Sequence, residues 1–136
     1  MSAYGPSITL DLAKKVTGAA LAEARANRWN MAVAVVDTAG FLVYFEKMDD
    51  TQSGSVAIAQ AKARSAALFK RSTKAFQDTL AGGGDGLRVL GLEGAVPVEG
   101  GMPVMIDGKI AGAIGVSGGT SAEDGRCAQA AVAALK

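Results

Sequence analysis

The sequence predicts an α/β (α+β) fold in which helices pack on an antiparallel sheet, and three observations lead to this prediction. Helical spacing of apolar residues opens and closes the chain, apolar runs of strand length lie between these segments, and Asp107-Gly108 separates two such runs. Asp-Gly at that place favours a type I′ hairpin turn, which needs positive φ at both central positions. The expected order is helix, two strands, two helices, two or three strands, helix, as in sheets with segregated helices.

The first half of the chain predicts a helix, a hairpin and a second helix. Residues Thr9 to Asn30 have amphipathic helical spacing with dipole-matched charges at both ends. The apolar run Met31 to Val36, the turn Asp37 to Gly40 and the strand Phe41 to Phe45 form the hairpin. After a polar break, alanine-rich helical spacing continues to about Phe69.

The region after this helix is less regular. Ser72-Thr73 can cap a short helix through Leu80, and the glycine-rich run from Ala81 to Gly86 is either a simple connection or a lid. Residues Leu87 to Val98 fit either a loop or a short strand around Ala95-Val96. The last helix is expected from Glu123 to Leu135.

Glycines mark the strand after the hairpin and the turn that follows it. Gly112 and Gly115 weaken a strand and supply no side chain, so they predict the close approach of another backbone, a helix or a ligand. In the following turn, Thr120 to Asp124 has the pattern of a capping box. Free N–H groups at such a helix start can also hold an anion, but the local acidic residues favour the capping interpretation.

Length and composition favour one globular domain, residues 1–136, with a core built from small residues. The chain is 49% hydrophobic but only 5% aromatic, and it has 18 glycines. Its formal charge of +1 provides no field for nucleic acid or an anionic membrane, so neither is an expected partner. No stretch approaches the roughly 20 apolar residues that span a bilayer, and with no leader pattern at the start a cytoplasmic location is expected.

The chain has no histidine and one cysteine, Cys127. The lack of histidine removes the commonest general base and the commonest transition-metal ligand, and a single cysteine excludes an intramolecular disulfide or multi-cysteine metal site. No metal site is therefore expected. Cys127 is most simply a small core residue, because a nucleophilic cysteine would lack its histidine partner.

Two residues are candidates for proton transfer, Lys62 and Asp37. Lys62 lies in an alanine-rich helix, where partial burial would suit a general base or imine chemistry; the alternative is a surface lysine paired with an acid. Asp37 is either a catalytic acid or, more commonly for this position, a turn former. Arg64 points about 200° away from Lys62 on a helix, so the two cannot clamp one carboxylate by adjacency.

The backbone at Gly100-Gly101, before Pro103, is a candidate anion site. Free N–H groups there could bind a carboxylate or an oxyanion, and the same glycines also suit a tight approach to the hairpin. Asp124 is a helix-start residue that could line a cleft with Ser117 and Gly118. Met102 and Met105 are expected on opposite faces of a strand, which disfavours a methionine clamp.

Several of these segments together resemble the GlcG and HbpS family (DUF336), which includes the C-terminal domain of the propanediol-utilisation adenosyltransferase. The resemblance spans nearly the whole chain, and its carriers are Ala34-Val35-Val36-Asp37 with Gly40, Ala59 to Ala66, Gly100-Gly101-Met102-Pro103, and Gly112 to Gly118 ending in Asp124. It implies a profilin-like three-layer α/β/α sandwich around a five-stranded antiparallel sheet. It also implies assembly into homodimers or homo-octamers, and a haem or other tetrapyrrole ligand in some members.

The missing histidine departs from the axial ligand expected in haem-binding relatives. Haem iron would have to be held without a protein ligand or take one of six other side chains: Met48, Met102, Met105, Tyr44, Cys127 or Lys62.

Two functions follow as hypotheses. The first is an oligomeric ligand-binding protein that takes haem or another tetrapyrrole. The second is an enzyme or accessory protein of small-molecule catabolism that acts on a carboxylate or carbonyl compound, with Lys62 or Asp37 moving a proton. The expected ligand-binding residues are Arg64, Gly100, Gly101, Met102, Ser117, Gly118 and Asp124.

Overall fold

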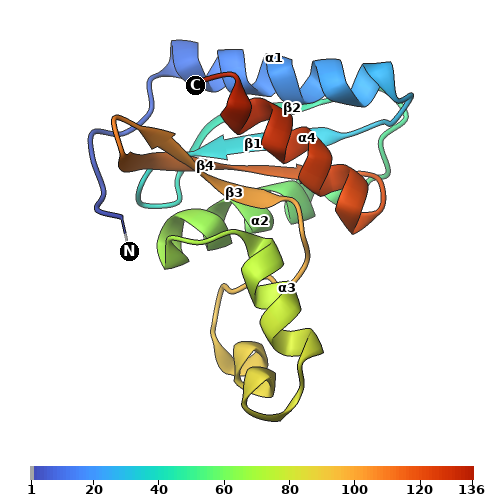
Figure 1. Ribbon diagram of the computed structural model, residues 1–136. Helices are drawn as coiled ribbons and strands as arrows, with labels where there is room; N and C mark the ends of the chain where they lie inside the picture. Colours follow the sequence, from blue (N-terminus) through green and yellow to red (C-terminus); the bar gives the residue numbers. More distant parts are fainter. Residues whose placement is uncertain (1) are drawn as a thin grey trace.

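A computed structural model describes residues 2–136 and contains one antiparallel sheet with helices on both faces (Figure 1). The sheet has four strands in the order β2-β1-β4-β3. Helices α1 and α4 pack side by side on one face, and α2 covers the other. The elements are α1 (Leu10–Ala26), β1 (Ala32–Val36), β2 (Leu42–Lys47), α2 (Ser55–Phe69), α3 (Thr73–Ala81), the 3₁₀ helix η1 (Gly84–Gly91), β3 (Gly101–Ile106), β4 (Lys109–Ser117) and α4 (Ser121–Ala133).

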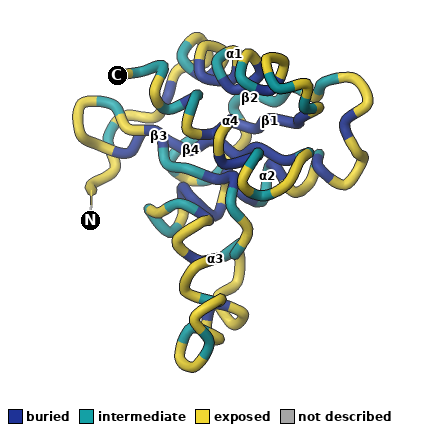
Figure 2. The backbone as a smooth tube through the Cα atoms, turned by 45° about the vertical axis from the view of Figure 1, so that its right-hand side comes forward, coloured by how far each residue is buried: buried dark blue, intermediate teal, exposed yellow. Residues whose placement is uncertain are grey.

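Strand β1 is buried on both of its faces, which explains its continuous apolar run. Val33 and Val35 join the core under α1 and α4, while Ala32, Ala34 and Val36 join the alanine-rich core under α2. Figure 2 shows this buried central layer, and shows that α3 and η1 extend away from it as a largely exposed lobe. We call these two elements the α3–η1 lobe.

The approach of a helix to the glycine-bearing strand is confirmed, and the helix is α2. A Cβ atom on Gly115 would collide with the backbone oxygen of Ala59 and lie 2.5 Å from the nitrogen of Ala63. Helix α2 therefore lies with its backbone almost directly on β4, as its buried alanines allow.

The turn chemistry read from the sequence is also confirmed. Asp107 and Gly108 both have positive φ, 51° and 75°, between the antiparallel strands β3 and β4. Thr120 and Glu123 form a complete capping box at the start of α4. The first helix, in contrast, ends at Ala26 rather than near Asn30, and Arg28 takes a positive φ of 60°.

The expected fifth strand is wrong for the described residues, because helix side chains bind the segment that could have formed it. The N–H groups of Val96 and Glu99 donate to Ser65 Oγ and Gln77 Oε1, at 3.0 Å and 2.8 Å. These bonds tie the segment to α2 and α3 instead of to a neighbouring strand. Part of the same region, with the last glycines of the expected loop, forms η1.

The N-terminal segment does not supply the missing strand either, since it meets β4 at one isolated parallel bridge, Tyr4 to Ile110. Within residues 2–136, no helix combines the length and the apolar character that crossing a membrane requires.

Cys127 lies at the centre of the core between α4 and α1, and its environment generates a pH prediction. Burial, with smaller contributions from Glu23 and Asp124, raises the pKa of the Cys127 thiol from 9.0 to about 12. A group whose pKa is raised by folding stabilises the protein fully below its unfolded pKa, and this contribution is lost as the pH rises from 9.0 towards about 12.

We therefore expect the free energy of unfolding to fall by about 1 kcal/mol more in the wild type than in Cys127→Ala when the pH is raised from about 8 to about 10. Urea denaturation of both proteins at the two pH values measures this difference. The same loss in both variants would show that Cys127 is not the group responsible.

Candidate functional site

The most strongly buried charge in the described chain belongs to Lys62 on α2, whose side chain is 1% exposed. Its Nζ donates to Asp124 Oδ2 on α4 at 2.9 Å and to the backbone oxygen of Val116 on β4 at 3.0 Å. The ion pair therefore joins the helix below the sheet, the sheet itself and a helix above it. Lys62 is neither a surface lysine nor open to solvent.

The carboxylate of Asp124 is 4% exposed and is bound on both oxygens. Its Oδ1 accepts the N–H of Gly119 at 2.9 Å, while Oδ2 accepts from Lys62. Burial raises the pKa of Asp124, and the hydrogen bonds from Lys62 and from Gly119 oppose that increase. The N–H groups of Gly119 and Thr120 both donate to acidic side chains of α4, so they are taken by capping rather than left for an external anion.

Gly100 has no side chain, and this makes room for the Lys62–Asp124 ion pair. It has a φ of +135°, and a Cβ atom there would lie 2.5 Å from the oxygen of Val116, 2.8 Å from Lys62 Nζ and 3.0 Å from the Cβ of Asp124. Gly101 is equally confined, since its Cβ would collide with the backbone oxygen of Lys62. The two glycines thus let β3 begin directly beside the buried lysine.

The expected anion site at these glycines lacks one of the donors on which it depended. The N–H of Gly101 donates to Thr73 Oγ1 at 2.8 Å, so it is not free. A cavity of about 50 Å³ opens beside Gly100, Gly101 and Met102. This volume suits an ordered water rather than an organic ligand.

The remaining predicted residues around the pair have structural contacts. Ser117 Oγ lies 3.0 Å from Ser55 Oγ, and both side chains are buried. Gly118 passes close to the backbone of Asn30 and Met31, where a Cβ would collide. Ser117, Gly118 and Asp124 are therefore brought together with Lys62, Gly100 and Gly101, as a closely packed junction.

Asp37 and Arg64 lie elsewhere. Asp37 accepts the N–H groups of Ala39 and Phe41 at 2.9 Å and 3.0 Å, which is the turn-forming role. It follows β1 at the end opposite Val33, the partner of Val116, so about 13 Å of strand separates it from the ion pair. Arg64 is exposed beside Gly40 of the same turn. The structure therefore does not place Lys62 and Asp37 in one proton-transfer site.

A larger cavity, which the sequence did not indicate, lies between the N-terminal segment and the β3–β4 hairpin. Its volume is about 420 Å³, and we call it the N-terminal groove. Backbone hydrogen bonds from Gly5 to Ile110 and from Ile8 to Ala111 hold the two walls together. It is lined by Gly5, Pro6, Ser7, Ile8, Thr9, Leu12, Ile106, Asp107 and Lys109. Its walls come from two segments that lie far apart in the sequence, residues 5–12 and 106–109, and no local pattern predicts that they meet.

None of the six proposed iron ligands lines this groove. Lys62 is bound in its ion pair, and burial raises the pKa of Cys127, which keeps it a neutral thiol. The hydrogen bond to Glu46 raises the pKa of Tyr44, which disfavours a phenolate ligand. Met102 lines only the small cavity, and Met105 lies partly exposed on β3.

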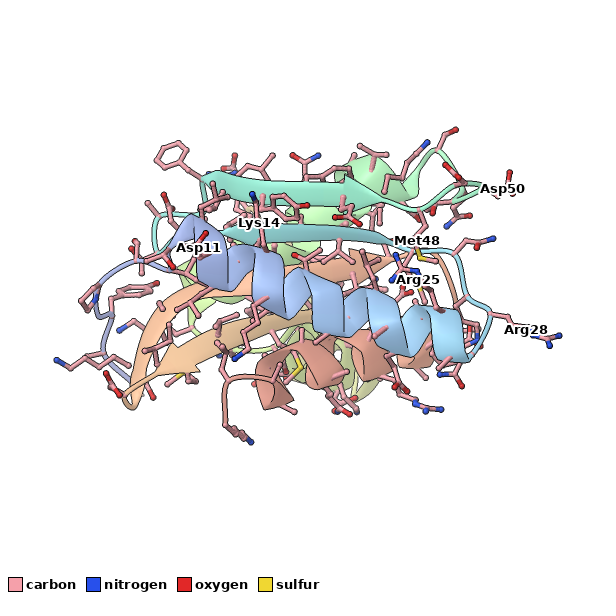
Figure 3. All side chains as sticks on the ribbon, turned by 90° about the horizontal axis from the view of Figure 1, so that it is seen from above. Asp11, Lys14, Arg25, Arg28, Met48 and Asp50 are labelled. Carbon is pink, nitrogen blue, oxygen red and sulfur yellow. The ribbon has the colours of Figure 1, made fainter. Side chains whose placement is uncertain are left out.

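Met48 lies at the opposite end of the molecule from the hairpin. Figure 3 shows it beside Arg25 at the C-terminal end of α1, where both line a cavity of about 420 Å³ surrounded by charged residues such as Glu46, Asp49 and Asp50. Its sulfur also accepts the N–H of Met31 at 3.3 Å. A charged cavity of this kind does not suit an apolar macrocycle.

The packing at Gly100 generates a stability prediction. We expect Gly100→Ala to lower the free energy of unfolding by about 2–4 kcal/mol, because it adds both a strained φ and a collision with Val116. Gly18→Ala is the matched control, since no atom lies within 4 Å of its Cβ position and α1 gains helix propensity there. Chemical denaturation measures both variants, and equal stability of the two would contradict the packing role of Gly100.

Comparison with known proteins agrees with this architecture. The family model described as "Haem degrading protein HbpS-like" matches residues 8–133. Protein GlcG of Escherichia coli strain K12 is 38% identical over 110 residues, which cover 81% of each chain. The crystal structure of Klebsiella pneumoniae protein ORFY has a TM-score of 0.87 at 29% identity, covering 98% of this chain and 94% of its own. The structure of a complex of PduOC with haem has a TM-score of 0.85 at 28% identity, covering 96% of each chain. Together with the α-helical layers on an antiparallel sheet, these matches show that the chain belongs to the HbpS-like (DUF336) family, which includes GlcG.

Proposed function

We propose that the protein binds haem or another tetrapyrrole in the N-terminal groove, and that it does so without a protein ligand to the iron. The observation that carries this proposal is an open cavity of about 420 Å³ whose walls are largely apolar, with Asp107 and Lys109 on the hairpin side. That volume falls within the usual range of about 300–1,000 Å³ for small-molecule sites. The similarity to PduOC, which was solved with haem, supports the ligand class.

The lining fits the two chemical parts of such a ligand. Ile8, Leu12 and Ile106 offer apolar contact for a flat ring, and Lys109 lies at the hairpin edge of the groove. Within residues 2–136, Lys109 takes part in no ion pair, so its ammonium is available to a carboxylate substituent. Binding then rests on the ring and its carboxylates.

Because no bond to iron is needed, we expect haem and iron-free protoporphyrin IX to bind with affinities within about threefold of each other. Absorption and fluorescence titrations measure the two affinities. Leu12→Asp places a charge in the apolar wall and should abolish the binding of both haem and protoporphyrin IX.

Lys109→Met should lower the affinity for both porphyrins by up to about fivefold, which is the effect expected from losing an exposed ion pair. Lys47→Met is the matched control, because Lys47 lies at the far end of the sheet on β2. The proposal fails if neither porphyrin saturates the protein. A much tighter affinity for haem, with the Soret shift of ligated iron, would instead show that a side chain binds the metal.

We also propose that the chain associates with itself into a homodimer or homo-octamer. The support is apolar surface at two places: Phe41, 71% exposed, with Leu42 beside the open edge of the sheet, and Leu90, 71% exposed, with Leu87 on η1. Surfaces of this kind commonly mark protein interfaces.

We expect light scattering after size exclusion to give a mass that is a multiple of 13.7 kDa. A charge introduced at the interface should lower that mass, so either Phe41→Glu or Leu90→Glu identifies the surface used. Met105→Glu is the control, since Met105 is 40% exposed on β3, at the edge of the sheet opposite β2, and belongs to neither surface. A monomeric wild type would contradict the proposal.

A further inference from the structure

A separate pocket lies within the α3–η1 lobe, and the proposed function does not use it. Its volume is about 230 Å³. Its apolar part is formed by Phe76 and Val89, which are buried, and by Leu92, while Arg71 and Arg88 lie at its border. Two guanidinium groups therefore lie next to an apolar surface.

The guanidinium of Arg71 is held in place by its neighbours. Its Nε donates to the backbone oxygen of Phe69 at 3.0 Å, and its Cζ lies 5.4 Å from the ring centroid of Phe76. Phe76 is fixed in turn by an edge-on contact with Phe69 at 5.5 Å. Arg71 forms no ion pair among the described residues, so its two terminal nitrogens remain for an external acceptor.

The second arginine is less strongly held. Arg88 on η1 lies 3.6 Å from Asp85, and both side chains are almost fully exposed. Such a pair is weak and easily rearranged in water. The pocket itself is formed because Gly86 brings η1 against the backbone oxygen of Thr79 on α3, where a Cβ would collide.

We propose that this pocket binds a small organic monocarboxylate with an apolar or aromatic body. Arg71, Arg88 and Asp85 give the lining a net charge of +1, which one carboxylate neutralises. A planar guanidinium matches a carboxylate with two parallel hydrogen bonds. Phe76, Val89 and Leu92 provide the apolar contact for the body of the ligand. The site uses no residue of the N-terminal groove or of the Lys62 junction.

Isothermal titration of the full chain with benzoate tests this proposal. We expect saturable binding in the millimolar range or tighter, with benzyl alcohol and acetate each weaker by about tenfold, because one lacks the charge and the other the ring. Arg71→Gln should lower the affinity for benzoate by about tenfold. Arg71→Lys should lower it by less, because lysine keeps the positive charge but lacks the planar guanidinium that makes two parallel hydrogen bonds.

Arg126→Gln is the matched control. Arg126 also lies over an aromatic ring, with its Cζ 5.3 Å from the centroid of Trp29, but it pairs with Glu23 outside the lobe. Its loss should leave benzoate binding unchanged. The proposal is overturned if benzoate does not saturate, if Arg71→Gln binds as well as the wild type, or if benzyl alcohol binds equally well. Weakening by Lys109→Met instead would place benzoate in the N-terminal groove and would also overturn it.

Discussion

A lysine ammonium buried between α2, β4 and α4 sets conditions that the surrounding backbone has to meet. Taking two charges out of water costs several kcal/mol per ion, and the cost is offset only where geometry and additional hydrogen bonds are good. Here Lys62 has the Val116 oxygen as well as Asp124, and Asp124 has the Gly119 amide as well as Lys62. One ion pair thereby fixes the relative position of the helices on the two faces of the sheet.

The glycines of the C-terminal half follow from this arrangement. Gly115 allows α2 to approach β4 closely, which brings Lys62 within reach of the far side of the sheet. Gly100 and Gly101 then let β3 begin beside the ammonium without a side chain in its way. The glycines of this segment therefore make room for a buried ion pair, although their pattern is also typical of a ligand-binding loop. The two cavities to which we assign organic ligands, the N-terminal groove and the pocket of the α3–η1 lobe, lie away from this junction.

Local signals predicted the parts of the fold that depend on neighbouring residues. The Asp107-Gly108 turn, the Thr120 to Glu123 capping box and the apolar strand β1 all rest on short-range rules of φ, capping and hydrophobic pattern. Features that depend on distant residues could not be read in this way. Ser65 and Gln77 hold the segment expected to form a strand, and Tyr4 meets Ile110 across most of the chain. For Lys62 the sequence left two alternatives open, partial burial and a surface position beside an acid, and an alanine-rich helix does not show which residue the lysine meets. The structure supplied the full burial and the partner, Asp124.

Lys62 and Asp124 act as one structural pair, and a double-mutant cycle measures how far the contribution of each depends on the other. Lys62→Met, Asp124→Asn and the double variant are compared with the wild type by chemical denaturation; asparagine keeps an oxygen for the Gly119 amide. Each single variant leaves an uncompensated buried group, so each should lose about 3–5 kcal/mol, while the double variant should lose clearly less than their sum. Losses that add to within about 0.5 kcal/mol would show that the two residues stabilise the fold independently and do not act as a pair.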